Sequence, residues 1–93
     1  MRYIGKNFFI EKVRASTLAG KYSTPLYCYS YNKLKENIIK FKKTFKTINP
    51  LICFAVKSNS NKILLREISK LGIGADVVSV GELMKALKAG IKP

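Results

Sequence analysis

The 93-residue chain has few acidic groups, few cysteines and no long apolar run, and each shortage excludes a class of protein. The longest apolar stretch, Leu51 to Val56, is far shorter than the ~20 residues that a membrane-spanning helix needs. Charges interrupt the segment before Lys12, so no signal peptide is expected. Cys28 and Cys53 lie in apolar, strand-like sequence and are expected to be small buried residues, not a disulfide pair or metal ligands. These features indicate a cytoplasmic protein.

The shortage of acidic residues leaves 18 Lys plus Arg against 5 Asp plus Glu, a formal net charge of +13. Such a charge is compatible with binding to nucleic acid or to an anionic membrane surface. The basic residues are spread through the chain, however, and the one cluster, Lys40, Lys42, Lys43 and Lys46, is typical of the solvated face of an amphipathic helix. We therefore expect no specific nucleic acid and no membrane as partners. A basic nucleic-acid-binding module stays open as an alternative, and its binding would weaken steeply with salt.

The first third of the chain has weaker patterns than the rest. A short helix is expected within residues 8–19, followed by a strand in the aromatic-rich residues 26–30. Ser30 is placed to cap a helix over residues 31–46, whose apolar positions recur at helical spacing and predict a stripe facing a core. The stripe consists of Leu34, Ile38, Phe41 and Phe45.

Two β/α units follow. Residues 51–56 are continuously apolar, which predicts a strand covered on both faces, and a helix leading to Gly72 comes next. A second strand begins after Gly74, and a helix follows in which Ser79 and Glu82 have the spacing of a capping box. Strands alternating with helices predict an α/β fold with a parallel sheet. Two units cannot close a barrel, so we expect the start of a (β/α)8 barrel, an architecture of ~250 residues.

Lys57 is the residue most indicative of chemistry. It comes directly after the apolar run, where the carboxyl end of a parallel strand is expected, and active sites of β/α barrels gather at that end of the strands. An apolar setting favours the neutral amine, which can attack an aldehyde and form a Schiff base. The alternative is a lysine that emerges into solvent where its strand ends.

The segment FAVKSNSNKILLREISKLG, residues 54–72, resembles the pyridoxal-phosphate attachment segment of the ornithine, diaminopimelate and arginine decarboxylase family. GADVVSVGELMKALKAGIKP, residues 74–93, and the earlier TPLYCYS resemble the diaminopimelate branch of that family. Ser23 departs from the glycine that the family usually has before Thr-Pro, at a turn that carries no catalytic residue. The resemblance implies a fold-type III, alanine-racemase-like barrel, with residues 1–30 as a lead-in segment containing one strand and residues 31–93 as an incomplete cofactor-binding barrel domain.

The resemblance also implies site residues, a cofactor and a reaction. Lys57 would bind pyridoxal 5'-phosphate covalently, and Asp76 would match the family's aspartate on the second strand. Ala55 would leave room for the cofactor ring on the side that Lys57 shares by strand alternation, whereas Ser79 and Glu82 are assigned to capping. The implied reaction converts meso-diaminopimelate to L-lysine and carbon dioxide in a homodimer, and this chain alone would be inactive. Ornithine, arginine or carboxynorspermidine decarboxylase, or a gene remnant without function, remain as alternatives.

Overall fold

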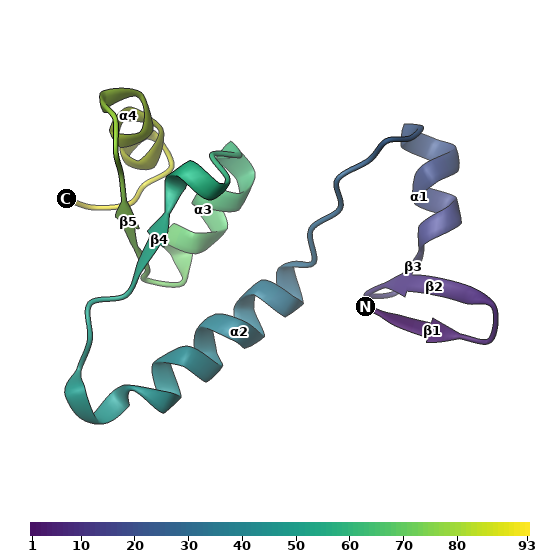
Figure 1. The fold of residues 1–93 in the computed structure, drawn as a ribbon, viewed down its shortest axis with the longest axis horizontal. Helices are drawn as coiled ribbons and strands as arrows, with labels where there is room; N and C mark the ends of the chain where they lie inside the picture. Colours follow the sequence, from purple (N-terminus) through teal and green to yellow (C-terminus); the bar gives the residue numbers. More distant parts are fainter. The chain divides into compact units, whose positions relative to one another are not determined.

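The computed structural model describes all residues from 1 to 93 (Figure 1). The chain forms two compact units, residues 1–36 and residues 37–93, which are described separately below. None of the helices has the length and apolar character needed to cross a membrane.

The first unit contains a small antiparallel sheet with the strand order β1-β2-β3. The strands are β1 (Arg2–Ile4), β2 (Asn7–Ile10) and β3 (Val13–Arg14), and α1 (Ala15–Tyr22) follows. Gly5, with φ of +57°, permits the tight turn between β1 and β2. Aromatic and β-branched side chains favour this hairpin, in which the rings of the register partners Tyr3 and Phe8 lie 4.9 Å apart.

The prediction of a helix within residues 8–19 is wrong for the first half of that range. Those residues form β2 and β3, and the helix runs over Ala15–Tyr22, three residues beyond the predicted end at residue 19. The apolar positions Ile10, Val13 and Leu18 fit helical spacing, but residues 7–10 pair instead with the first strand. Pairing between strands overrode a weak helical pattern.

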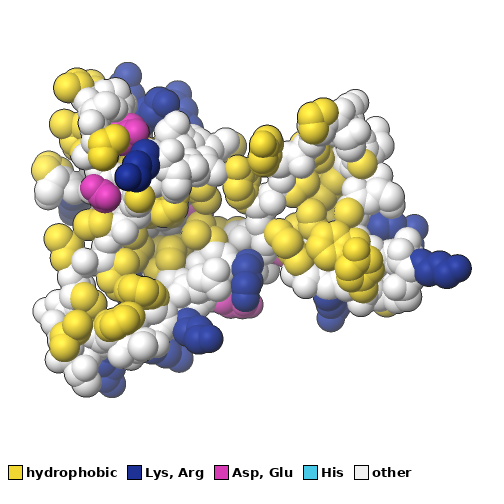
Figure 2. Space-filling model, viewed as in Figure 1, with side chains coloured by type: hydrophobic (Ala, Val, Ile, Leu, Met, Phe, Trp, Pro, Cys, Tyr) yellow, Lys and Arg dark blue, Asp and Glu magenta, His cyan; other side chains and the backbone are white.

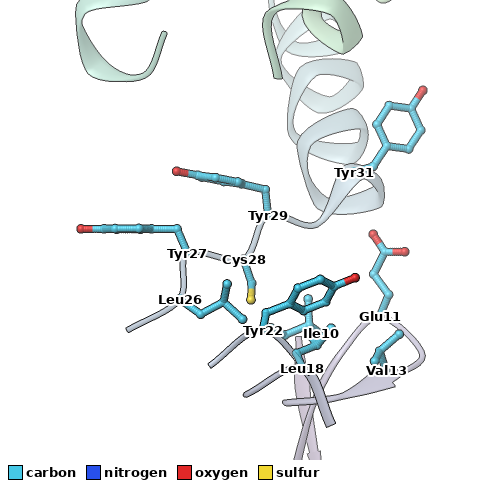
Figure 3. A pocket seen from close by; sticks show the side chains of 10 residues that line it. All are labelled: Ile10, Glu11, Val13, Leu18, Tyr22, Leu26, Tyr27, Cys28, Tyr29 and Tyr31. Atoms are coloured by element: carbon cyan, nitrogen blue, oxygen red, sulfur yellow. The ribbon is translucent and has the colours of Figure 1, made fainter. Parts of the chain in front are cut away.

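The strand predicted over residues 26–30 is also absent, since this segment belongs to no sheet. Figure 3 shows Tyr27 and Tyr29 pointing to one side and Cys28 to the other, the alternation of an extended chain. The backbone is therefore extended as the residues indicate, but no neighbouring strand pairs with it. Cys28 is half-buried and has a free thiol.

Ser30 caps the next helix, α2 (Tyr31–Thr44), as predicted. Its hydroxyl accepts a hydrogen bond from the Lys33 backbone N–H at 3.1 Å and donates one to Glu11 Oε1 at 2.8 Å. The Glu11 carboxylate also accepts from the backbone and side-chain amides of Asn32, each at 3.0 Å. A carboxylate at a helix N-terminus satisfies free amides and opposes the positive end of the helix dipole. Glu11 thereby ties the β2–β3 turn to the start of α2.

This arrangement predicts a dependence of stability on pH. The backbone N–H of Asn32 and then the hydroxyl of Ser30 hold the pKa of Glu11 below its ordinary value of 4.5. A lowered pKa in the folded state gives stabilisation that is present above pH 4.5 and lost as the pH falls through the folded-state pKa. We expect the first unit to unfold more readily below about pH 4.5, and Glu11→Gln to lessen this change.

Tyrosine fluorescence during thermal unfolding at several pH values checks the expectation, because all five tyrosines lie within residues 1–36 and the chain has no tryptophan. Glu36→Gln is the matched control, since Glu36 is exposed and makes only a 3.9 Å ion pair with Lys33. Equal acid sensitivity of the Glu11→Gln variant and the unchanged chain would contradict this role for Glu11.

Helix α2 confirms the predicted helix, but it ends at Thr44, two residues early, and is followed by a 3-10 turn, η1 (Lys46–Ile48). The predicted stripe is only partly covered, and none of its four residues is buried. Phe41 and Phe45 are 50% and 38% exposed, and their rings lie 4.6 Å apart. The stripe thus forms as predicted, without the core contact expected of it.

The second unit confirms the predicted parallel β/α arrangement. Strand β4 (Cys53–Ala55) pairs in parallel with β5 (Gly74–Asp76), and α3 (Lys62–Lys70) connects them. Helix α4 (Val80–Lys88) follows β5. Gly72, with φ of +67°, comes just after α3, where a left-handed residue commonly ends a helix.

The core of this unit lies on one face of the two strands. Val56, Leu65 and Ala89 form a buried cluster, against which three partly buried residues of the sheet and the segment after it pack: Phe54, Ala75 and Val77. Leu65 lies on α3 and Ala89 just after α4, so helices cover this face of the sheet (Figure 1). Removal of this apolar surface from water is the main stabilising contribution to the unit.

The opposite face of the strands is open in this structure, contrary to the prediction of a strand covered on both sides. The regular strand is three residues long, and Cys53 is exposed, not buried as expected. A Cβ added at Gly74 would lie 2.9 Å from the Cys53 sulfur, so these register partners face the same side. The next partners on this face, by alternation, are Ala55 and Asp76.

One member of the lysine cluster, Lys42 on α2, has a structural role that the sequence pattern did not indicate. Lys42 Nζ donates a 2.6 Å hydrogen bond to the carbonyl of Leu71, at the C-terminal end of α3. A cation there stabilises the free carbonyls and the negative end of the helix dipole. On the face that Figure 2 shows, Lys and Arg side chains are scattered and form no single dense patch.

Candidate active site at the end of strand β4

Lys57 lies in a single 3-10 turn, η2 (Val56–Ser58), which follows β4 directly. The chain leaves the strand after Ala55, so strand alternation does not decide the direction of the Lys57 side chain. The side chain is exposed. The predicted position at the carboxyl end of a parallel strand is therefore observed, but Lys57 lies in the turn that follows the strand and not in the strand itself.

Both neighbours of Lys57 are held in place. The Val56 side chain is fully buried in the core cluster. The Ser58 hydroxyl donates a 2.7 Å hydrogen bond to the carbonyl of Ala55, and the Asn59 N–H donates to the Val56 carbonyl at 3.1 Å. The turn thus fixes the backbone of Lys57 while its amine extends into solvent.

The loop after the turn is fastened to both helices. The Asn61 side chain caps α3 by accepting hydrogen bonds from the N–H groups of Ile63 and Leu64 at 2.9 Å and 3.2 Å. Lys85 Nζ of α4 donates to the Ser60 hydroxyl at 2.9 Å. The residues Ser58 to Asn61, in the order Ser-Asn-Ser-Asn, favour turns and helix caps. Nothing in the sequence, however, predicts the hydrogen bond between Lys85 and Ser60.

Asp76 and Ala55 are register partners at the ends of β5 and β4. Asp76 is exposed and Ala55 half-buried. A carboxylate and a small side chain therefore lie side by side on the open face, each on the last residue of its strand. The structure brings the three predicted site residues to one end of the two-stranded sheet.

Lys57 and Asp76 form no ion pair with each other here, and the two ion pairs of the chain, Lys33–Glu36 and Lys70–Glu67, lie elsewhere. Ser79 and Glu82, in contrast, form the predicted capping interactions. The Ser79 hydroxyl accepts from the Glu82 N–H at 3.2 Å, and the Glu82 carboxylate accepts from the Val78 N–H at 2.9 Å. These contacts confirm their assignment to the start of α4.

The first unit has a concavity of about 500 Å³, shown in Figure 3. Its walls are mainly apolar and aromatic, and no lysine lines it. Its carboxylate, Glu11, is already bonded to the start of α2. The concavity therefore offers no lysine amine for a Schiff base with an aldehyde. Its lining residues are Ile10, Glu11, Val13, Leu18, Tyr22, Leu26, Tyr27, Cys28, Tyr29 and Tyr31.

An exposed amine lies just after one parallel strand, and a carboxylate lies at the end of the neighbouring strand. Active sites of β/α folds gather at this end of the strands, and a lysine amine there is compatible with Schiff-base chemistry on an aldehyde. The family described as pyridoxal-dependent decarboxylase, pyridoxal binding domain, matches residues 31–93. The chain belongs to this family. The match includes the turn that carries Lys57 and the whole β4-α3-β5-α4 region.

Two curated relatives show the level of similarity. Diaminopimelate decarboxylase of Helicobacter pylori strain J99 is 50% identical over 72 residues, which are 77% of this chain and 18% of that protein. Diaminopimelate decarboxylase of Aquifex aeolicus is 46% identical over 93 residues, all of this chain and 22% of that protein. The chain thus spans about a fifth of the length of these relatives.

Solved structures agree with this assignment. A crystal structure of an Aquifex aeolicus protein aligns over 97% of this chain and 22% of its own, with a TM-score of 0.90 and 47% identity. Diaminopimelate decarboxylase of M. jannaschii aligns over 91% of this chain and 21% of its own, with a TM-score of 0.87 and 37% identity. A structure of the same M. jannaschii enzyme has been solved in complex with L-lysine.

Proposed function

We propose that these residues supply the first part of a (β/α)8 barrel in a diaminopimelate decarboxylase, which releases carbon dioxide from meso-diaminopimelate and leaves L-lysine. The single observation that carries the proposal is the position of Lys57, held in a fixed turn at the carboxyl end of a parallel strand. Lys57 would hold the cofactor covalently through its aldehyde.

The residues present fit pyridoxal phosphate. The sheet face that carries Ala55 is open, and a methyl side chain at that position leaves space for a flat ring beside the strand. Asp76, at the end of the neighbouring strand, would accept a hydrogen bond from the Lys57 ammonium whenever that amine is not joined to the cofactor. When bound, the cofactor accepts the electron pair left on the substrate carbon as carbon dioxide departs.

The whole protein is proposed to be a cytoplasmic homodimer with residues of both subunits in each site. In this proposal residues 1–30 lead into the barrel domain, which begins at residue 31, where the family match also begins. We expect the phosphate-binding glycines and the partner of the ring nitrogen in the part of the relatives' length that these 93 residues do not cover. The 93-residue chain alone is therefore expected to be inactive.

A hybrid enzyme tests the proposal, with these 93 residues replacing the matching 22% of the Aquifex aeolicus relative. We expect the purified hybrid to contain pyridoxal phosphate, to release carbon dioxide from meso-diaminopimelate, and to give a borohydride-reduced adduct that peptide mapping places on Lys57 and not on the chain's 14 other lysines.

The substrate is tested in the same preparation by offering ornithine and arginine beside meso-diaminopimelate. Release of carbon dioxide from ornithine but not from meso-diaminopimelate would overturn the substrate assignment. A folded hybrid with the circular dichroism spectrum of its parent, but with the adduct on another lysine, would overturn the role of Lys57.

A further inference from the structure

The turn that carries Lys57 is stabilised by one buried side chain and by two hydrogen bonds, one of which is the backbone bond from the Asn59 N–H to the Val56 carbonyl at 3.1 Å. On one side, Val56 is buried in the core with Leu65 and Ala89. On the other side, the exposed hydroxyl of Ser58 reaches back 2.7 Å to the carbonyl of Ala55. The burial of Val56 is an apolar contact and the contact of Ser58 is one side-chain hydrogen bond, so each can be removed without the other by substitution of a side chain.

The conformation of the turn determines where the Lys57 amine points. In a 3-10 helix, successive side chains are about 120° apart, because there are three residues per turn. In an extended strand they are about 180° apart, because side chains alternate between faces. With Val56 anchored in the core, loss of the turn would redirect the Lys57 side chain relative to Ala55 and Asp76.

We propose that Ser58 is a positioning residue, whose hydroxyl keeps the segment after β4 in a 3-10 turn and so aims the Lys57 amine. This inference rests on the proposed function of Lys57 as the point of cofactor attachment. Ser58 is exposed, and its hydroxyl forms its hydrogen bond to the carbonyl of Ala55, just before the turn. Its hydroxyl acts on the direction of the neighbouring side chain.

The first experiment uses NMR on the 93-residue chain to measure the three-bond HN–Hα coupling of Lys57, which is small in a helical turn and larger in an extended chain. We expect Ser58→Ala to raise this coupling and Ser58→Thr, which keeps the hydroxyl, to leave it low. Ser60→Ala is the matched control, because its hydroxyl bonds Lys85 and not the turn. An unchanged coupling in Ser58→Ala would overturn the inference.

The second experiment measures the same variants in the hybrid enzyme. Ser58→Ala is expected to lower kcat about fivefold, the equivalent of one ordinary hydrogen bond, and to reduce the fraction of cofactor trapped on Lys57, with little change in KM. Ser58→Thr should restore both values. If the unchanged hybrid attaches cofactor at Lys57 and Ser58→Ala matches it, the positioning role fails while the proposed function stands. If the unchanged hybrid attaches no cofactor at Lys57, the proposed function fails first.

Discussion

Replacement of Lys57 by alanine in the hybrid enzyme is expected to abolish covalent attachment of pyridoxal phosphate and to lower kcat roughly 10³-fold, the contribution of a positioned catalytic group. The reason is chemical, since Lys57 is the only lysine in the segments that directly follow β4 and β5. Absorbance of the bound cofactor and release of carbon dioxide measure the two effects. Lys57→Arg should fail as well, because a guanidinium stays protonated and is a poor nucleophile.

Lys62→Ala is the matched control for this experiment. Lys62 lies five positions further on, at the start of α3, and is exposed like Lys57. Its loss should leave cofactor content and turnover within about twofold of the unchanged hybrid, as expected for a surface position away from the chemistry. Retention of bound cofactor and full turnover in Lys57→Ala would contradict the proposed function directly.

Replacement of Leu65 by alanine is expected to lower the free energy of unfolding of the second unit by about 3 kcal/mol, within the range for buried leucines. Leu65 is fully buried against Val56 and Ala89, so the change leaves a cavity beneath the turn that carries Lys57. Stability scales at about 0.05–0.15 kcal/mol per residue, so a unit of residues 37–93 has only a few kcal/mol to lose. Urea unfolding of the 93-residue chain, followed by circular dichroism, provides the measurement.

Ile63→Ala, on the same helix, is the control for Leu65→Ala. Ile63 is 71% exposed, so the same kind of truncation removes little buried surface and should cost well under 1 kcal/mol. Equal losses in the two variants would show that α3 does not pack on the strands through Leu65. Loss of urea stability in Leu65→Ala alone would support the observed core.

The second half of the chain could be interpreted from sequence because its signals are local and mutually consistent. Asn61 caps α3, Ser79 caps α4, and Gly72 follows α3 at a positive φ, all near their expected positions. Buried positions such as Leu65 and Ile68 recur at helical spacing. Each of these features depends on residues within one or two turns of each other.

The first half was harder to interpret because its structure depends on pairing between segments. Whether residues 7–10 form a strand or part of a helix is determined by the hairpin with β1, and the extended residues 26–30 lack a partner. Glu11 caps a helix that begins 20 residues later. No local pattern around Glu11 indicates such a contact.

Sequence alone determined the alternation of strands and helices after residue 50, the identity of Lys57 as the reactive candidate and the membership of a decarboxylase family. Tertiary structure decided that Lys57 lies in a 3-10 turn, that Ser58 closes this turn on Ala55, and that Asp76 faces the same open side as Ala55. The physical reason is distance along the chain. Periodicity and capping act between near neighbours, whereas strand register and the direction of a side chain depend on contacts that form only after distant segments pack together.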